Sequence, residues 1–324
     1  MQDRNRIAKE ARAFDKQTLE RVSHGHIPDL RQAKFCRYFY NSPWRDPAYV
    51  KLDFGEQFEL INSAIKKYSA RRKTNINILE VGCGPGYLSL ELARTGYHVT
   101  GIDISAECIR IAKKFADSDP WKHKRASLQY LNGDFLRVSD ILQKSTYDVV
   151  IFLGTLHHFK DQRFTLKNPR GIVIVHEPTR DRVTEGNAAF MHLVQLLLSV
   201  GKGYYRNLSF PSSLSECKKM VRDVLRASRY EDAHGKKVQS VNDNESGHLE
   251  MYTALKRNFK ELVYQERYAF FHEIIGGLRF GRRKNAILAR YLRDMDHYLC
   301  ELGVLQATEY FFVGRKIVTL KNGK

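Results

Sequence analysis

The pattern of apolar and polar positions changes twice along the chain. Residues 1–74 predict mainly helices, and Phe54–Tyr68 has the apolar spacing near 3.6 that is typical of one buried helix face. From residue 75 to residue 178, short apolar runs rich in β-branched side chains alternate with helical patterns. Continuous apolar runs of this kind indicate parallel strands that are covered on both faces of a sheet.

Five strands are expected in this middle region, at 75–81, 98–102, 127–131, 147–153 and 171–175. After Pro178 the alternation stops. Residues 186–229 predict helices interrupted around 201–211, and 230–248 is polar enough to predict a loop. The remaining elements are a helix at 249–258, a strand at 261–270, a long helix at 284–302 and a last strand at 308–313.

The expected fold is therefore α/β, with a Rossmann-like, doubly wound and mostly parallel sheet plus a helical cap. We expect the cap segment over 1–74 and the Rossmann-like core over 75–178. A helical lid insertion is expected over 179–248, and 249–324 is expected to complete the core sheet around an inserted helix.

Composition limits the class of protein. Of the 324 residues, 43% are hydrophobic, which is enough to build a packed core. The first ten residues are polar, and no apolar run approaches the roughly 20 residues of a membrane-spanning helix. The five cysteines are scattered and never in CxxC spacing, which argues against a disulfide framework or a zinc site. We therefore expect a cytoplasmic protein that holds no metal.

The formal net charge of +18 is concentrated in the two flanking regions of the chain. Residues 1–74 carry +7 and residues 181–324 carry +8, whereas 75–180 carry +3. Only short clusters stand out, such as Arg71-Arg72-Lys73 and Arg282-Arg283-Lys284. A basic surface attracts nucleic acid, anionic lipid headgroups or a phosphorylated substrate, and it equally serves solubility.

The first predicted strand ends in a glycine loop, Ile78–Gly86 (ILEVGCGPG), with GxGxG spacing instead of the GxGxxG of dinucleotide binders. Asp103 ends the second strand, where its carboxylate can accept both hydroxyls of a ribose, and Asp134 follows the third. Ligands of such folds bind at the carboxyl ends of the strands. Together these positions predict a site for a nucleotide-like ligand.

Five segments resemble the motifs of class I S-adenosylmethionine-dependent methyltransferases, in order ILEVGCGPG, GIDIS (101–105), NGDF (132–135), YDVVIFLGTLHHF (147–159) and IVIVHEP (172–178). Segments 249–270 and 308–316 are similar to the final helix and antiparallel strand pair of that fold. The resemblance implies S-adenosyl-L-methionine as cofactor, S-adenosyl-L-homocysteine as product and an antiparallel last strand.

The resemblance also implies which residues surround the cofactor. Glu80 and the loop glycines would lie around its methionine part, Asp103 would bind the ribose, and Asp134 and Phe135 would flank the adenine. The full implied set is Glu80, Gly82, Cys83, Gly84, Gly86, Asp103, Ile104, Asp134, Phe135, Leu153 and Gly154. Within this set, Cys83 is interpreted as a small packing residue and not as a nucleophile.

The fourth motif, LGTLHHF, lacks the Asn/Asp-Pro-Pro-aromatic tetrapeptide of amino-group methylases and the Pro-Cys of cytosine methylases. It resembles instead the enzymes that act on small molecules, quinones, sugars or lipids, so we expect a small or lipid-like acceptor that is methylated at oxygen. His157 and His158 follow the fourth strand, where either is a candidate general base; alternatively, the pair is structural.

Further candidates for the acceptor site are Tyr38, Tyr40, Trp44, His176, Glu177 and His192, although aromatic side chains at helical spacing are equally typical of a core. The apolar segment Phe190–Val200 would line an acceptor pocket, contact a membrane surface or pack against the sheet.

Three other functions are weighed against this one. The basic flanks favour an RNA methyltransferase, although no RNA-binding module is recognisable, which leaves nucleic acid as an alternative partner. A non-catalytic subunit that keeps the cofactor fold is a second alternative. An NAD-dependent oxidoreductase is the third, and the GxGxG spacing and Glu80 count against it.

Overall fold

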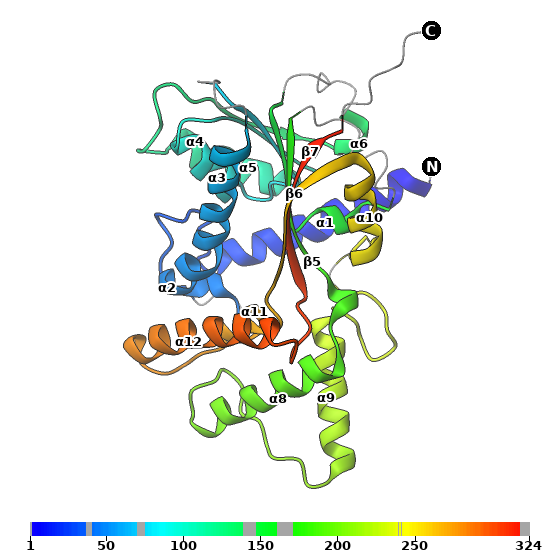
Figure 1. The fold of residues 1–324 in the computed structure, drawn as a ribbon. Coiled ribbons are helices and arrows are strands. Elements are labelled where there is room, and N and C mark those ends of the chain that lie inside the picture. Colours follow the sequence, from blue (N-terminus) through cyan, green and yellow to red (C-terminus); the bar gives the residue numbers. More distant parts are fainter. Residues whose placement is uncertain are drawn as a thin grey trace. The chain divides into compact units, whose positions relative to one another are not determined.

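The structure, a computed structural model, describes residues 2–36, 41–69, 75–138, 147–160, 171–238, 240 and 242–317 (Figure 1). The chain forms two compact units. The first unit comprises residues 1–58, 178–243 and 266–309, and the second comprises 59–177, 244–265 and 310–324. Each unit is described by itself below, and the expected division of the chain at residues 74, 178 and 248 stays a prediction.

Among the described residues, seven strands form one sheet in the order β3-β2-β1-β4-β5-β7-β6. Their bounds are β1 Asn77–Val81, β2 His98–Asp103, β3 Leu128–Asn132, β4 Val149–Leu153, β5 Ile172–Pro178, β6 Phe259–Arg267 and β7 Glu309–Lys316. The first five strands pair in parallel, with β1 in the middle. The first five predicted strands are therefore confirmed to within a few residues at their ends.

Strand β7 runs against its neighbours. At its end, the Lys316 N–H donates to the Gly171 carbonyl, just before β5 begins, at 3.2 Å. The next residue, Ile317, donates to the Asn258 carbonyl, just before β6 begins, at 3.3 Å. The end of β7 thus lies beside the starts of β5 and β6, which confirms a mostly parallel sheet with an antiparallel last strand.

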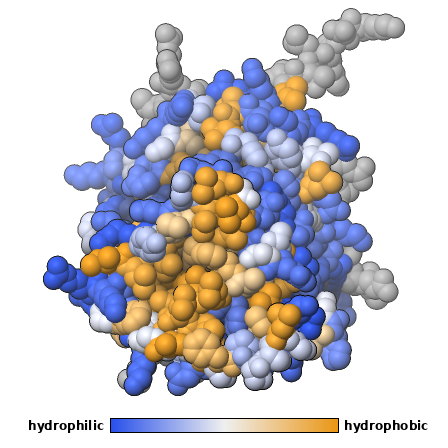
Figure 2. Space-filling model, turned by 60° about the horizontal axis from the view of Figure 1, so that its bottom comes forward, coloured by the Kyte–Doolittle hydropathy of each residue, from blue (hydrophilic) through white to orange (hydrophobic). Residues whose placement is uncertain are grey.

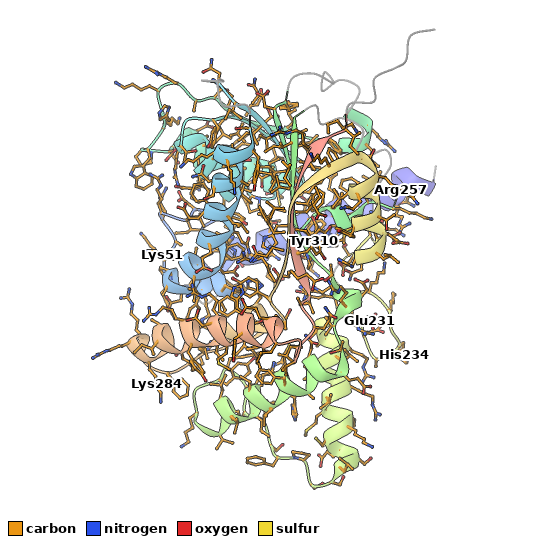
Figure 3. The ribbon with its side chains drawn as sticks, viewed as in Figure 1. Lys51, Glu231, His234, Arg257, Lys284 and Tyr310 are labelled. Carbon is orange, nitrogen blue, oxygen red and sulfur yellow. The ribbon has the colours of Figure 1, made fainter. Side chains whose placement is uncertain are left out.

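In the second unit, helices cover both faces of the sheet, with α4 and α5 on one side of the strands and α10 on the other (Figure 1). The helices are α4 Tyr87–Arg94, α5 Ala106–Asp117, α6 Phe135–Val138, α10 His248–Asn258, most of α3 Glu56–Tyr68, and a 3₁₀ turn at Leu156–His158. Phe152, Leu255 and Phe312 are fully buried in the core between sheet and helix, as is Tyr310 on β7 (Figure 3). This burial holds the strand ends, and the loops that follow them, in fixed positions.

The first unit is helical. Its elements are α1 Gln2–Ser23, a 3₁₀ turn Pro43–Arg45, α2 Pro47–Val50, a π-helical segment Lys51–Gly55, a 3₁₀ turn Arg180–Arg182, α8 Glu185–Val200, α9 Leu214–Ser228, α11 Phe271–Ile275 and α12 Arg282–Glu301. Its core contains Tyr49, Met191, Phe271 and Leu278. Thr184 and Ser213 cap α8 and α9, each accepting a backbone N–H with its side chain, so both helices begin where the sequence offers a capping hydroxyl. The predicted interruption of the helical region around 201–211 is confirmed.

The prediction that the sixth strand runs to Phe270 is wrong, because β6 ends at Arg267. The backbone N–H groups of Ala269 and Phe270 donate instead to the carboxylate of Asp296 on α12, at 2.7 and 2.8 Å. Asp296 is fully buried, so these bonds replace the strand pairing that the apolar sequence favours.

Candidate active site

The parallel register brings four loops to one edge of the sheet. Glu80 on β1 lies opposite Gly101 on β2 and Ile151 on β4, and Leu153 on β4 lies opposite His176 on β5. The residues that follow these strands therefore emerge together at their carboxyl ends, as the spacing of the motifs predicted.

The glycine loop after β1 is a tight turn anchored on β2. The Gly82 N–H donates to the Ile102 carbonyl at 2.8 Å, and the Gly86 N–H donates to the Cys83 carbonyl at 3.0 Å. Gly82, Gly84 and Gly86 all have positive φ, the left-handed region that glycine adopts without strain. Cys83 is buried against Ile109 and Tyr130, and burial raises the pKa of its thiol, which supports the packing role expected for it.

Gly84 and Gly86 differ in what lies beside them. A Cβ added at Gly86 would lie 2.8 Å from the Cβ of Ala112 and 2.5 Å from the hydroxyl of Tyr130, which itself donates to the Gly86 carbonyl. A Cβ at Gly84 would meet nothing within 4 Å.

This difference makes a matched pair of substitutions. Gly86→Ala is expected to lower the free energy of unfolding by about 3 kcal/mol, because a left-handed alanine and a steric overlap are combined there. Gly84→Ala, with positive φ but open space, should lose only about 1 kcal/mol. Urea unfolding of the ligand-free protein measures both values, and equal losses would contradict the packing explanation.

Asp103 links β2 to the glycine loop. One carboxylate oxygen accepts the Gly84 N–H at 2.8 Å, and the other accepts the Ser105 N–H at 2.8 Å. Ser105 in turn caps α5 by accepting the Cys108 N–H at 3.0 Å. The half-buried carboxylate is thus held in one orientation at the position expected for a ribose, with Ile104 half-buried beside it.

Glu80 is buried at the end of β1, where the Ser89 hydroxyl of α4 donates a short hydrogen bond to its carboxylate. Burial raises the pKa of Glu80 to about 8, although the bond from Ser89 acts in the opposite direction. A cation brought near this carboxylate would favour its ionised form and lower that pKa. This chemistry fits the positively charged methionine part of the expected cofactor.

The residues after β3 have different surroundings. The Asn132 side chain donates to the carbonyls of Asp103 and Ile104, each at 3.1 Å, and so fixes the end of β2. Asp134 accepts the Leu136 N–H at 3.0 Å and caps the short helix α6. The Phe135 ring is buried in the core against Phe152 and Phe159, with ring centroids about 6 Å apart. Contact of Asp134 and Phe135 with adenine stays a prediction.

The loop after β4 is organised by one buried carboxylate, that of Glu177 on β5. A single oxygen of Glu177 accepts the N–H groups of Thr155 and Leu156, both at 2.7 Å. The other oxygen lies 2.6 Å from the ring Nδ1 of His157. Glu177 therefore caps the 3₁₀ turn that carries the histidines and also orients one of them.

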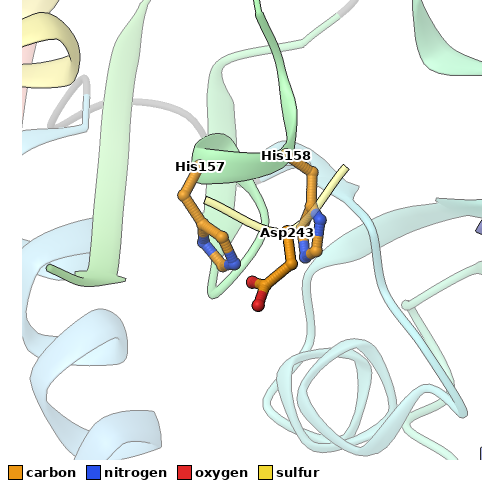
Figure 4. A group of neighbouring side chains, drawn as sticks. All are labelled: His157, His158 and Asp243. Carbon is orange, nitrogen blue, oxygen red and sulfur yellow. The ribbon is translucent and has the colours of Figure 1, made fainter. Parts of the chain in front are cut away.

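His157 and His158 lie side by side, with ring centroids 4.2 Å apart (Figure 4). His157 is buried and held to Glu177, whereas His158 is half-buried. With Nδ1–H donating to Glu177, the imidazole of His157 keeps a basic lone pair on Nε2. His176 is buried next to Phe311, and its backbone carbonyl accepts the Gly154 N–H at 2.9 Å. A catalytic role for any of these histidines stays a prediction.

The remaining acceptor candidates lie elsewhere. Tyr38 and Tyr40 fall outside the described residues. Trp44 and His192 belong to the first unit, where the Trp44 ring stacks on Phe54 with centroids 4.5 Å apart and His192 is buried on α8. Their contact with an acceptor stays a prediction.

Sequence reasoning missed the supporting residues of the site, which are Ser89, Tyr130, Asn132 and Thr155. Asn132 stands within the third motif, so its position at a strand end offered a signal. Tyr130 offered none, because it lies 44 residues from the carbonyl that it binds.

The site fits the expected cofactor. Gly84 and Gly154 have positive φ and nothing within 4 Å of the position of a Cβ, so the space beside the backbone is open in the loops after β1 and β4. A ligand can approach the main chain closely there. Asp103 supplies the oriented carboxylate for ribose hydroxyls, and Glu80 supplies a carboxylate suited to a cation.

A comparison with known families determines the family to which this chain belongs. The methyltransferase domain family matches residues 54–262, well over half of the chain. The chain belongs to this family. It is a class I S-adenosylmethionine-dependent methyltransferase, and S-adenosylmethionine is its cofactor. No helix within the described ranges combines the length and the apolar content that a bilayer crossing requires.

Two relatives of this methyltransferase are ubiquinone biosynthesis O-methyltransferases. The mitochondrial one of Schizosaccharomyces pombe is 40% identical over 86 residues, 26% of this chain and 30% of the relative. The one of Glaesserella parasuis is 24% identical over 176 residues, 52% of this chain and 69% of the relative. The match therefore spans less than a third of the yeast enzyme.

Among solved structures, the methyltransferase is similar to a SAM-dependent methyltransferase of Methanosarcina mazei. The two chains are 16% identical with a TM-score of 0.44, over 76% of this chain and 95% of that one.

Proposed function

We propose that this methyltransferase transfers the methyl group to a hydroxyl oxygen of a small-molecule or lipid-like acceptor, with His157 as general base. The observation that carries the proposal is the distance of 2.6 Å between His157 Nδ1 and the fully buried carboxylate of Glu177. A histidine held in this way has a defined tautomer, and the carboxylate stabilises the positive charge of its ring once the ring is protonated. The two O-methyltransferases to which the chain is similar favour oxygen as the methylated atom.

The residues act in sequence. The cofactor, when bound, supplies an electrophilic methyl group on a sulfonium. Asp103 and the glycine loop hold it at the strand ends, and this positioning lowers the entropic part of the barrier. His157 Nε2 takes the proton of the acceptor hydroxyl as its oxygen forms the new bond to the methyl carbon. The carbon–sulfur bond breaks in the same step, and S-adenosyl-L-homocysteine leaves with the electron pair. Glu177 stabilises the resulting imidazolium and keeps Thr155 and Leu156 in place.

The test is methyl transfer from labelled S-adenosylmethionine to four acceptor classes: phenols, phenols bearing an isoprenoid tail, amines and RNA. We expect label on a hydroxyl of one of the phenols. Label in RNA alone, with binding that weakens steeply with salt, would replace this proposal by an RNA methyltransferase. Cofactor binding without transfer to any acceptor would instead indicate a non-catalytic partner subunit.

A further inference from the structure

The first unit exposes an apolar patch that its core does not use. Leu193, Leu197 and Val200 follow each other along α8 at the spacing of one helix face, and all three are exposed. Phe210 and Leu214 extend the patch and are 65% and 71% exposed. We call these five residues the α8 patch. Figure 2 shows apolar side chains gathered on this face, with hydrophilic ones around them.

The loop that carries Phe210 is attached to the helix. The Leu208 N–H donates to the Ser199 hydroxyl on the last turn of α8 at 2.7 Å. Ser213 then caps α9, which begins at Leu214 and packs along α8. The residues of the patch are therefore held in place by the fold, and contiguous apolar surfaces of this kind mark interaction sites.

The charge around the α8 patch is mainly basic, and the acidic residue that follows the patch is Glu216, which accepts hydrogen bonds from Ser212. Residues 186–215 contain no Asp or Glu, and their two charged side chains, Lys202 and Arg206, are both exposed and basic. Residues 274–293 also contain no Asp or Glu and carry six Lys or Arg. A segment of this composition repels cations and other basic surfaces and attracts anions.

These two segments lie side by side. The Tyr205 N–H donates to the Gly277 carbonyl at 2.9 Å, and the Arg279 N–H donates to the Gly203 carbonyl at 2.8 Å. The Phe280 ring packs against Gly203, and the Lys284 ammonium lies 4.1 Å from the centroid of that ring (Figure 3). The exposed cluster Arg282-Arg283-Lys284 thus stands next to the turn at the end of α8.

We propose that the α8 patch and the Arg282–Lys284 cluster form a docking surface for an anionic lipid bilayer. Aliphatic and aromatic side chains enter the acyl boundary while lysine and arginine contact the headgroups, which is how interfacial helices bind without crossing the membrane. A second copy of the chain would set two basic surfaces against each other. RNA would not use the exposed leucines and valine. The inference rests on this surface alone and does not depend on the methyl acceptor.

Flotation with phospholipid vesicles tests the proposal on the full chain. We expect binding to vesicles of phosphatidylcholine with about one third phosphatidylserine, and much weaker binding to phosphatidylcholine alone. Leu197→Gln/Phe210→Gln should lower the partition constant roughly tenfold or more, because two apolar side chains leave the interface. Arg282→Gln/Arg283→Gln/Lys284→Gln should lower it at least as much and weaken its salt dependence.

The controls lie in the second unit. Leu249→Gln removes an equally exposed leucine, and Lys113→Gln/Lys114→Gln/Lys124→Gln removes three exposed charges. Both should leave vesicle binding unchanged within about twofold. The proposal is overturned if the unmodified chain does not float with anionic vesicles, or if the patch variants float as it does. A dimer that Leu197→Gln/Phe210→Gln dissociates, without any vesicle binding, would assign the surface to a second copy instead.

Discussion

Replacing Asp103 with alanine is expected to weaken binding of S-adenosylhomocysteine by about 100-fold, as measured by titration calorimetry. Hydrogen bonds to a charged group contribute about 1.5–3 kcal/mol each, and loss of two bonds to ribose hydroxyls therefore removes roughly 3 kcal/mol. The carboxylate is already oriented by the Gly84 and Ser105 N–H groups, each 2.8 Å away, so binding requires little reordering of the side chain.

The same substitution leaves those two N–H groups without their acceptor, so local disorder of the loop is a competing explanation. Ser105→Ala separates the two. It removes the cap on Cys108 and should lower the free energy of unfolding by about 1 kcal/mol, yet it keeps the carboxylate and should keep cofactor affinity. If Ser105→Ala weakened binding as much as Asp103→Ala, the ribose role of Asp103 would be abandoned.

The sequence predicts those parts of the site in which the local backbone requires a particular type of residue. A glycine that must adopt positive φ, a carboxylate that ends a parallel strand and a serine that caps a helix each leave a local signal, and the structure has Gly86, Asp103 and Ser105 in these roles. The antiparallel direction of the last strand followed from the resemblance of the motifs to a known fold.

The parts that the sequence does not predict depend on contacts between distant segments. Glu177 was expected only to face the acceptor, yet it accepts hydrogen bonds from a loop about 20 residues earlier. The end of β6 was misplaced because Asp296, 26 residues away, takes the N–H of Phe270. No local pattern records such pairings, because each partner alone is compatible with several surroundings.

The pattern of apolar and polar positions also did not predict the division of the chain into these two units. The first unit collects three stretches of chain, 1–58, 178–243 and 266–309, around one apolar core. Each stretch by itself shows only amphipathic helices. Helical periodicity shows which face of a helix is buried, but it does not show which other element packs against that face. The sequence therefore left open whether the leucines of α8 line a pocket, contact a membrane surface or pack in a core, and the structure has Leu193 and Leu197 exposed.

Replacing His157 with alanine is expected to lower kcat by about 10²- to 10⁴-fold, the range that a positioned general base supplies, while cofactor affinity stays within about threefold. His158→Ala should have a smaller effect, because His157, held by Glu177, is the proposed base. His234→Ala, at an exposed position of the first unit, serves as the matched control and should leave kcat unchanged (Figure 3).

The acidity of the acceptor distinguishes a base from a merely structural histidine. An acceptor hydroxyl that is already ionised at the assay pH has no proton to give, so the rate deficit of His157→Ala should shrink with increasingly acidic phenols. Glu177→Gln should show the same trend with a smaller deficit, because glutamine keeps an acceptor for Thr155 but no longer supports a positive charge on His157. If the rate deficit of His157→Ala stays constant across the phenols, the role of His157 is structural. Methyl transfer would then depend only on the alignment of the acceptor oxygen with the methyl group.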